Sequence, residues 1–180
     1  MPTEKIEELP KDFSSEIGRI SLHFAYLERE MRNSVDCLLD LSRSDLGYAV
    51  TAELSCKALR NLLGSLHKIV ERDTEIIAEL DNILNQITKI EEKRNVILHS
   101  LWRYNSRNDT IERIKSTAKS KGLSWQFQAF DLSMLKDFVF DIGVVRNLLK
   151  DFIFSNRTKY SSLFRRMEIM KRIKDNNLPE

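Results

Sequence analysis

Proline and glycine are scarce in this chain, and their scarcity is the feature that most limits how it can fold. Among 180 residues there are three prolines and five glycines, and all three prolines, Pro2, Pro10 and Pro179, lie near the ends. Proline interrupts helices and glycine weakens them, so an interior without proline and with few glycines favours long helices. A β-sandwich needs turn residues at short intervals. The sequence therefore predicts an all-α fold.

Apolar residues recur at spacings of three and four along four stretches, which is the pattern of helices with one buried face. The expected helices span residues 12–41, 46–71, 75–101 and 131–155. Amphipathic helices joined by short turns bury their apolar faces best in an antiparallel bundle. We therefore expect an antiparallel four-helix up-down bundle, built as a single domain over residues 1–180 with its core at about 12–155.

The helical pattern stops between the third and fourth predicted helices. The segment Asn105–Asp109 is rich in turn residues, and Leu123–Ala129 alternates between apolar and polar side chains. Strict alternation is typical of a half-buried strand. We expect a short β-hairpin-like insert at about residues 103–130.

A basic amphipathic helix is expected at the C-terminal end, at about residues 159–174. It contains Arg165 and Arg166, and only one acidic residue, Glu168, lies among its basic side chains. A helix of this kind can bind a phosphate backbone, lie on a membrane surface or pack on its own bundle.

Charge and cysteine content narrow the functional classes. The formal net charge is only +2, but acidic residues outnumber basic ones before Arg94 and basic residues predominate from there onward. Such asymmetry is typical of a nucleic-acid partner or of a patchwork of solvated faces.

Cys37 and Cys56 fall within helical patterns, so we expect small packing residues and not a disulfide or zinc site. We expect no metal and no cofactor. The absence of a signal peptide or a long apolar run favours a cytoplasmic protein without membrane attachment.

One short motif suggests chemistry. Arg94, Asn95 and His99 lie near the end of the third predicted helix. Residues four apart share a helix face, which puts Asn95 and His99 together and leaves Arg94 on the apolar stripe. Histidine transfers protons near neutral pH, and arginine binds phosphate oxygens. An alternative is structural: Arg94 would be a buried cation paired with Glu28 of the first helix, and His99 a helix-end residue.

The run from Arg94 to His99 resembles the Arg-x4–6-His signature of HEPN domains, many of which are metal-independent endoribonucleases. The resemblance implies a helical-bundle homodimer in which Arg94, Asn95 and His99 of two chains form one catalytic site. It also implies RNA as the substrate and a setting in toxin–antitoxin or antiviral defence, with an antitoxin protein as a possible partner. The basic residues then expected to bind RNA are Arg103, Lys115, Arg165 and Arg166.

A second interpretation remains open at this stage. Some HEPN members have no catalytic activity and serve as dimerisation or binding modules. The sequence is then that of a helical bundle that binds a protein or a nucleotide. Paired His99 side chains in a dimer would favour the enzyme, whereas Arg94 buried against Glu28 would favour the module.

Overall fold

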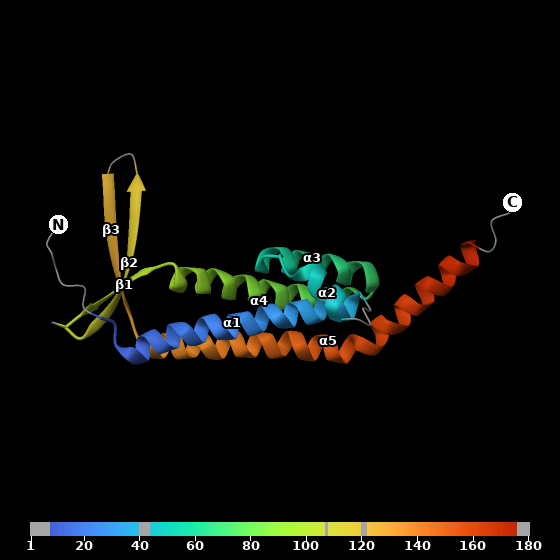
Figure 1. The fold of residues 1–180 in the computed structure, drawn as a ribbon, viewed down its shortest axis with the longest axis horizontal. Coiled ribbons are helices and arrows are strands. Elements are labelled where there is room, and N and C mark those ends of the chain that lie inside the picture. The colour runs from blue at the N-terminus through green and yellow to red at the C-terminus, as the bar shows by residue number, and fades with distance from the viewer. Residues whose placement is uncertain (1–7, 40–43, 107, 120–121, 176–180) are drawn as a thin grey trace. The chain divides into compact units, whose positions relative to one another are not determined.

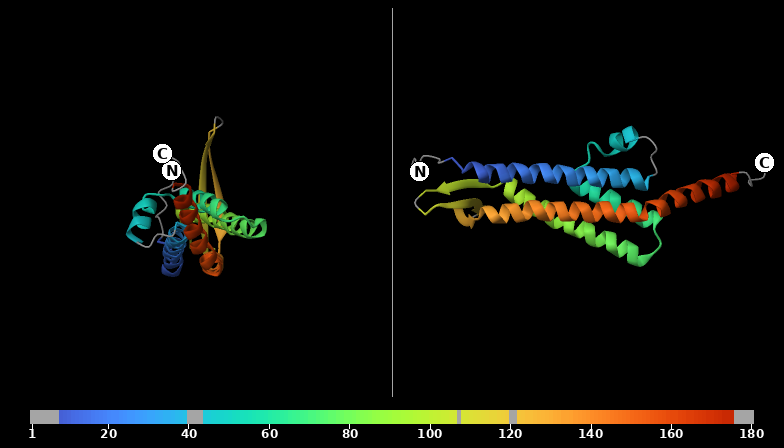
Figure 2. Two further views of the ribbon diagram at one scale, coloured as in Figure 1. Left: turned by 90° about the vertical axis from the view of Figure 1, so that its right-hand side faces the viewer. Right: turned by 90° about the horizontal axis from the view of Figure 1, so that it is seen from below.

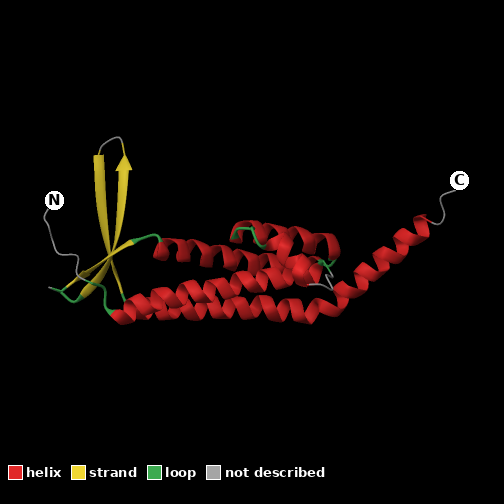
Figure 3. Cartoon of the chain, in the orientation of Figure 1, coloured by secondary structure: helices red, strands yellow, loops and turns green. Residues whose placement is uncertain are grey.

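The computed structural model describes residues 8–39, 44–106, 108–119 and 122–175, and for residues 44–46, 116–119, 122–123, 158–159 and 161–175 the backbone alone. The protein is mostly helical with one three-stranded antiparallel sheet (Figures 1 and 3). The elements are α1 (Lys11–Leu38), α2 (Ser44–Thr51), α3 (Cys56–Val70), α4 (Thr74–Leu98), β1 (Leu101–Asn105), β2 (Thr110–Lys119), β3 (Gly122–Phe130) and α5 (Leu132–Asp175). No helix in these ranges is both long enough and apolar enough to span a membrane.

The chain divides into two compact units. The first unit comprises residues 1–25 and 90–143, and the second comprises residues 26–89 and 144–180. Three helices, α1, α4 and α5, contribute to both units because the boundaries fall within them. The motif residues and the whole sheet therefore belong to the first unit.

An aromatic cluster joins the sheet to the helices of the first unit. The ring of Trp102 on β1 lies 5.1 Å from that of Phe13 on α1 and 5.1 Å from that of Phe130 on β3, in edge-on geometry at both contacts. Its Nε1 donates a hydrogen bond to the carbonyl of Ile97, at 3.1 Å. The first turns of α1 and α5 lie side by side in both views (Figures 1 and 2), and Phe138 of α5 is fully buried. The packing of Trp102 against Phe13 and Phe130 thus sets the position at which β1 begins.

The sheet has the order β1-β2-β3. β1 pairs only with the first half of β2, from Asn105 opposite Thr110 to Leu101 opposite Ile114. The pairing of β2 with β3 continues to Lys119 opposite Gly122. Beyond β1 the sheet is therefore a two-stranded hairpin.

Helices α3 and α4 form an antiparallel pair in the second unit. Lys68 and Asp81 form an ion pair at 2.9 Å, and a Cβ at Gly64 would lie 3.1 Å from Cδ1 of Leu84, so the helices are in close contact there. Glu71 ends α3, and its Oε1 accepts hydrogen bonds from the backbone N–H groups of the next two residues. This carboxylate therefore stabilises the tight turn into α4.

A buried polar pair anchors α5 in the same unit. Nε2 of His67 lies 2.9 Å from the hydroxyl of Tyr160, and both side chains are buried. Phe152 packs edge-on against the imidazole, with ring centroids 5.5 Å apart. The pair joins α3 to the middle of α5.

Three expectations about the elements were wrong. The helix predicted at 46–71 is two helices, because Ser55 ends the connection after α2 and its side chain accepts a hydrogen bond from the N–H of Ala58 as the N-cap of α3. The helices predicted at 131–155 and 159–174 are one helix, α5, since no proline or glycine interrupts the chain between Gly143 and Asp175. The predicted hairpin has a third strand, β1, which begins where the third helix was expected to end.

Candidate functional site

The motif residues lie at the C-terminal end of α4. Arg94 and Asn95 occupy its last turns, and His99 follows the final helical residue, with its backbone N–H donating to the carbonyl of Asn95 at 3.1 Å. The side chains of Asn95 and His99 are exposed. The helix ends here and not at Leu101 because the chain turns into β1, where the half-buried Trp102 packs against Phe13. His99 is thus an exposed imidazole at the junction of helix and sheet.

Arg94 has a divided environment. One terminal nitrogen, Nη1, donates a hydrogen bond to Oδ1 of Asn95 at 2.9 Å, at the surface. The guanidinium carbon lies 5.1 Å from the ring centroid of Phe24, a cation–π distance. Its Nε is buried and has no hydrogen-bond partner among the described residues. The guanidinium therefore packs on the ring of Phe24, and its Nη1 is oriented at the surface by the hydrogen bond to Asn95.

The predicted pairing of Arg94 with Glu28 stays a prediction. Glu28 is half-buried and belongs to the second unit, whereas Arg94 belongs to the first. Within the described residues, Arg94 contacts Phe24 and Asn95.

Arg113 is a further candidate that the sequence did not reveal. Its Nε donates to the hydroxyl of Ser100, the residue after His99, at 2.8 Å, and its Nη1 donates to Gln128 at 3.2 Å. The hydroxyl of Ser100 in turn donates to the carbonyl of Val96. This chain of contacts brings a second guanidinium to the end of α4. No local sequence signal marks it, because its position depends on the β1–β2 register, which places Arg113 opposite Trp102.

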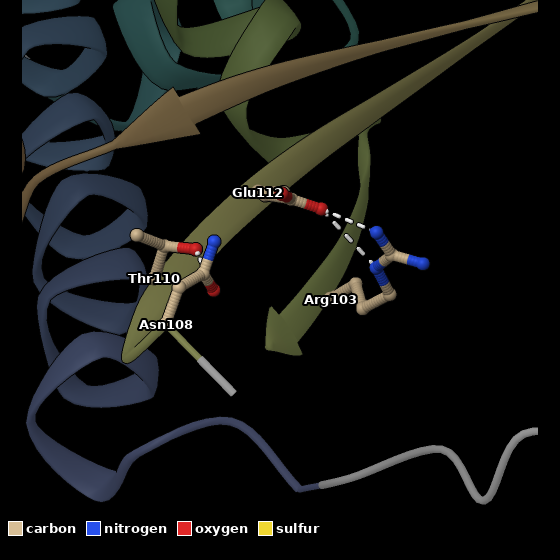
Figure 4. A network of polar contacts seen from close by, with 4 residues as sticks. All are labelled: Arg103, Asn108, Thr110 and Glu112. Atoms are coloured by element: carbon tan, nitrogen blue, oxygen red, sulfur yellow. Dashed lines mark hydrogen bonds and ion pairs between the residues drawn. The ribbon is translucent and has the colours of Figure 1, made fainter. Parts of the chain in front are cut away.

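Two of the other predicted RNA-binding residues, Arg103 and Lys115, lie on opposite faces of the sheet. Arg103 forms an ion pair with Glu112 at 2.6 Å (Figure 4) and lies over the ring of Phe127 at 4.8 Å. Lys115 is exposed on β2, and the strand alternation puts it on the opposite face of the sheet from Arg103. Arg165 and Arg166 lie in the part of α5 for which only the backbone is described.

A polar groove lies on the second unit between α3 and α4. Its volume is about 570 Å³, and its lining includes Arg60, Lys68, Asn61 and Asn85. None of the motif residues lines it. Asp81 also lines the groove and forms the ion pair with Lys68, so its lining has two basic residues and one acidic residue.

The end of α4 combines three groups that could take part in proton transfer and anion binding. It supplies one exposed imidazole, one amide and an arginine that the amide orients, with Arg113 close by. Cleavage of RNA needs a base for the attacking hydroxyl and an acid for the leaving oxygen, so a single imidazole is one group short.

Comparisons with known proteins found no significant match to any protein-family model, curated protein or solved structure.

Proposed function

We propose that the protein is a metal-independent endoribonuclease of HEPN type that works as a homodimer. The observation that carries the proposal is the exposed His99 imidazole, one helical turn from exposed Asn95, whose amide oxygen accepts a hydrogen bond from Arg94. These are the proton-transfer group, the orienting amide and the phosphate-binding cation that the chemistry needs. Two copies facing each other would supply two of each.

The reaction proceeds by attack of the ribose 2′-oxygen on the adjacent phosphorus. His99 of one copy accepts the proton of the 2′-hydroxyl while the new oxygen–phosphorus bond forms. His99 of the second copy, in its cationic form, donates a proton to the departing 5′-oxygen as its bond to phosphorus breaks. Arg94 stabilises the negative charge on the non-bridging oxygens. The products are a 2′,3′-cyclic phosphate and a free 5′-hydroxyl.

The test is RNA cleavage by the full chain in the presence of EDTA, with His99→Ala as the informative variant. General acid–base groups contribute about 10²–10⁴-fold in rate, so His99→Ala is expected to lose at least that much. Val96→Ala is the matched control, because it shortens another exposed side chain of the same helix end without changing proton-transfer chemistry. Activity that chelation abolishes, or that persists in His99→Ala, would refute the assignment.

The proposal includes a wider setting taken from the HEPN resemblance. It comprises a HEPN-like helical core at about residues 12–155 within one domain, action in the cytoplasm on RNA, and a role in toxin–antitoxin or antiviral defence with an antitoxin protein. Induced expression of the wild-type chain is expected to arrest growth, whereas His99→Ala is expected to be tolerated. Equal toxicity of both chains would contradict this setting.

A second candidate function is a catalytically inactive module that binds a nucleotide. The observation in its favour is the polar groove between α3 and α4, whose lining includes Arg60 beside the Lys68–Asp81 ion pair. The packing of Arg94 on Phe24 also suits a structural role. Calorimetric titration with a nucleoside triphosphate would test it. We expect binding that Arg60→Ala weakens and His99→Ala leaves unchanged if this function is correct.

A further inference from the structure

Strand β3 is an open edge of the sheet. Within the described residues it pairs with β2 on one side and with no strand on the other. Residues 124–129 are all exposed. The backbone N–H and C=O groups of alternate residues point away from β2, so this edge offers hydrogen-bonding groups to another strand.

The edge lacks the features that usually prevent strand pairing. Natural proteins protect exposed edges with charged residues, above all lysine, or with proline. β3 has the sequence GLSWQFQAF, which contains neither a charge nor a proline over nine residues. The opposite side of the sheet is different, because Arg103 lies on β1 and exposed Lys115 lies on the part of β2 beyond β1. The lack of protection is thus specific to β3.

Two large aromatic side chains lie together on one face of β3. Trp125 and Phe127 are two residues apart, so they share a face, and they are 44% and 53% exposed. Phe130 lies on the other face and packs against Trp102. The Trp125–Phe127 face is therefore the one directed away from the aromatic cluster.

We propose that β3 pairs antiparallel with β3 of a second copy of this chain, which joins two three-stranded sheets into one of six strands. The centre of the nine-residue strand is Gln126. Pairing over its full length places Gln126 opposite Gln126 of the second copy and Trp125 opposite Phe127 of the second copy. A shift of one residue would place Trp125 opposite glutamine and move the aromatic rings to opposite faces. The register that pairs the two strands over their full length is therefore also the register that places Trp125 opposite Phe127.

A second copy suits this edge better than a charged peptide does. An uncharged strand gains no ion pair from a basic or acidic partner, but it meets its own copy without repulsion. Antiparallel pairing of a strand with itself is isologous, the symmetry of the commonest oligomers. The pairing also adds two strands beside the part of the β2–β3 hairpin that extends beyond β1. This stabilises it, because a hairpin of two strands is only marginally stable alone.

This contact is independent of the catalytic dimer. In a continuous six-stranded sheet the two β1 strands lie five strand spacings apart, about 24 Å at about 4.8 Å each. His99, two residues before β1, cannot then meet its copy across a single phosphate. A chain that uses both contacts would assemble beyond a dimer, so failure of one proposal leaves the other intact.

Disulfide trapping in the full chain tests the register. In the proposed pairing, Cα atoms of directly opposite residues are about 4.5–5.5 Å apart, within the range that a disulfide spans. Gln126→Cys is therefore expected to give a covalent dimer on mild oxidation. Gln128→Cys is the matched control: its two copies would be four residues apart along the strands, about 13 Å, and would not be bridged. Wild-type chain oxidised in parallel accounts for Cys37 and Cys56.

Sedimentation of the full chain provides the second measurement. The wild type is expected to associate at micromolar concentration, and Trp125→Lys is expected to weaken that association about tenfold or more, because it places a charge on the edge. Phe140→Lys, an equally drastic change at an exposed residue of α5, is expected to have no effect. A monomeric wild type, equal trapping of Gln126→Cys and Gln128→Cys, or equal effects of the two lysine variants would overturn the proposal.

Discussion

Arg94 lies partly in the packed interior of the first unit and partly at its surface. Its position on the apolar stripe of α4 was deduced from helix geometry, and the burial of Nε agrees with that deduction. The guanidinium carbon lies 5.1 Å from the ring centroid of Phe24, and cation–π contacts of this kind are worth about 0.5–2 kcal/mol. The outer nitrogen nevertheless reaches Asn95 at the surface. One side chain thus contributes to packing and to the candidate site.

Arg94→Ala is therefore expected to lower the melting temperature as well as activity. A loss of about 1 kcal/mol corresponds to about 2–4 °C in a chain of this size. Asn95→Ala is the matched control, since it removes the exposed hydrogen-bond partner and leaves the Phe24 contact in place. Thermal melts beside the cleavage assay measure both effects. An unchanged melting temperature in Arg94→Ala would exclude the packing role.

Tyr160→Phe is expected to destabilise the second unit. The change removes the hydroxyl that lies 2.9 Å from Nε2 of buried His67. Loss of a partner for a buried polar group costs about 1–3 kcal/mol. Tyr48→Phe is the control, because that ring is 67% exposed. Urea unfolding at neutral pH measures the difference, and equal free energies of unfolding for the two variants would contradict the assigned role.

The same hydroxyl makes stability depend on alkaline pH. Burial, with a smaller contribution from Glu71, raises the pKa of Tyr160 above its ordinary value of 10.0. The unfolded chain therefore loses this proton at lower pH than the folded chain does. The stabilisation from Tyr160 is fully present below about pH 10 and declines as the pH rises further. The free energies of wild type and Tyr160→Phe are expected to converge in that range, and a constant difference up to pH 12 would contradict this.

Among the helices, the sequence predicted the bounds best where local signals mark where a helix begins and ends. Both α1 and α4 begin within one residue of the predicted start, and each ends three residues before the predicted end. The break between α2 and α3 was missed because Ala52, Glu53 and Leu54 contain no glycine or proline, and only the Ser55 cap marks it. β1 was missed because the side chains that bury Trp102 lie far away in the sequence, on α1 and β3.

The packing of α2 on α1 has a testable origin at Gly47. A Cβ at Gly47 would lie 1.7 Å from Oδ1 of Asp36, a buried oxygen without a described hydrogen-bond partner. Gly47→Ala is therefore expected to cost about 1–3 kcal/mol through overpacking. With Asp36→Ala in the same chain the clash disappears, and Gly47→Ala should then gain about 0.5–1 kcal/mol of helix stability. Equal effects in both backgrounds, measured by denaturant unfolding, would show that the two residues do not interact.

At the scale of the whole molecule, the candidate site was only partly predictable. The location of Arg94, Asn95 and His99 at one helix end followed from spacing alone. The approach of Arg113 depends on strand register and the division of the chain into two units on long-range contacts, neither of which has a local sequence signal. Whether two copies complete the site is a property of the assembly. It needs an experiment that counts chains for each active site.

Mixing chains gives that count. Wild-type chain is equilibrated with rising proportions of His99→Ala at constant total concentration, and RNA cleavage is measured at each ratio. A site that needs His99 from both copies is active only in dimers of two wild-type chains, so activity is expected to fall with the square of the wild-type fraction. Mixing with Val96→Ala is the control and should leave activity unchanged. A linear fall would mean that each chain carries a complete site. Dimers joined through β3 alone would also give a linear fall, because that contact does not bring two His99 side chains together.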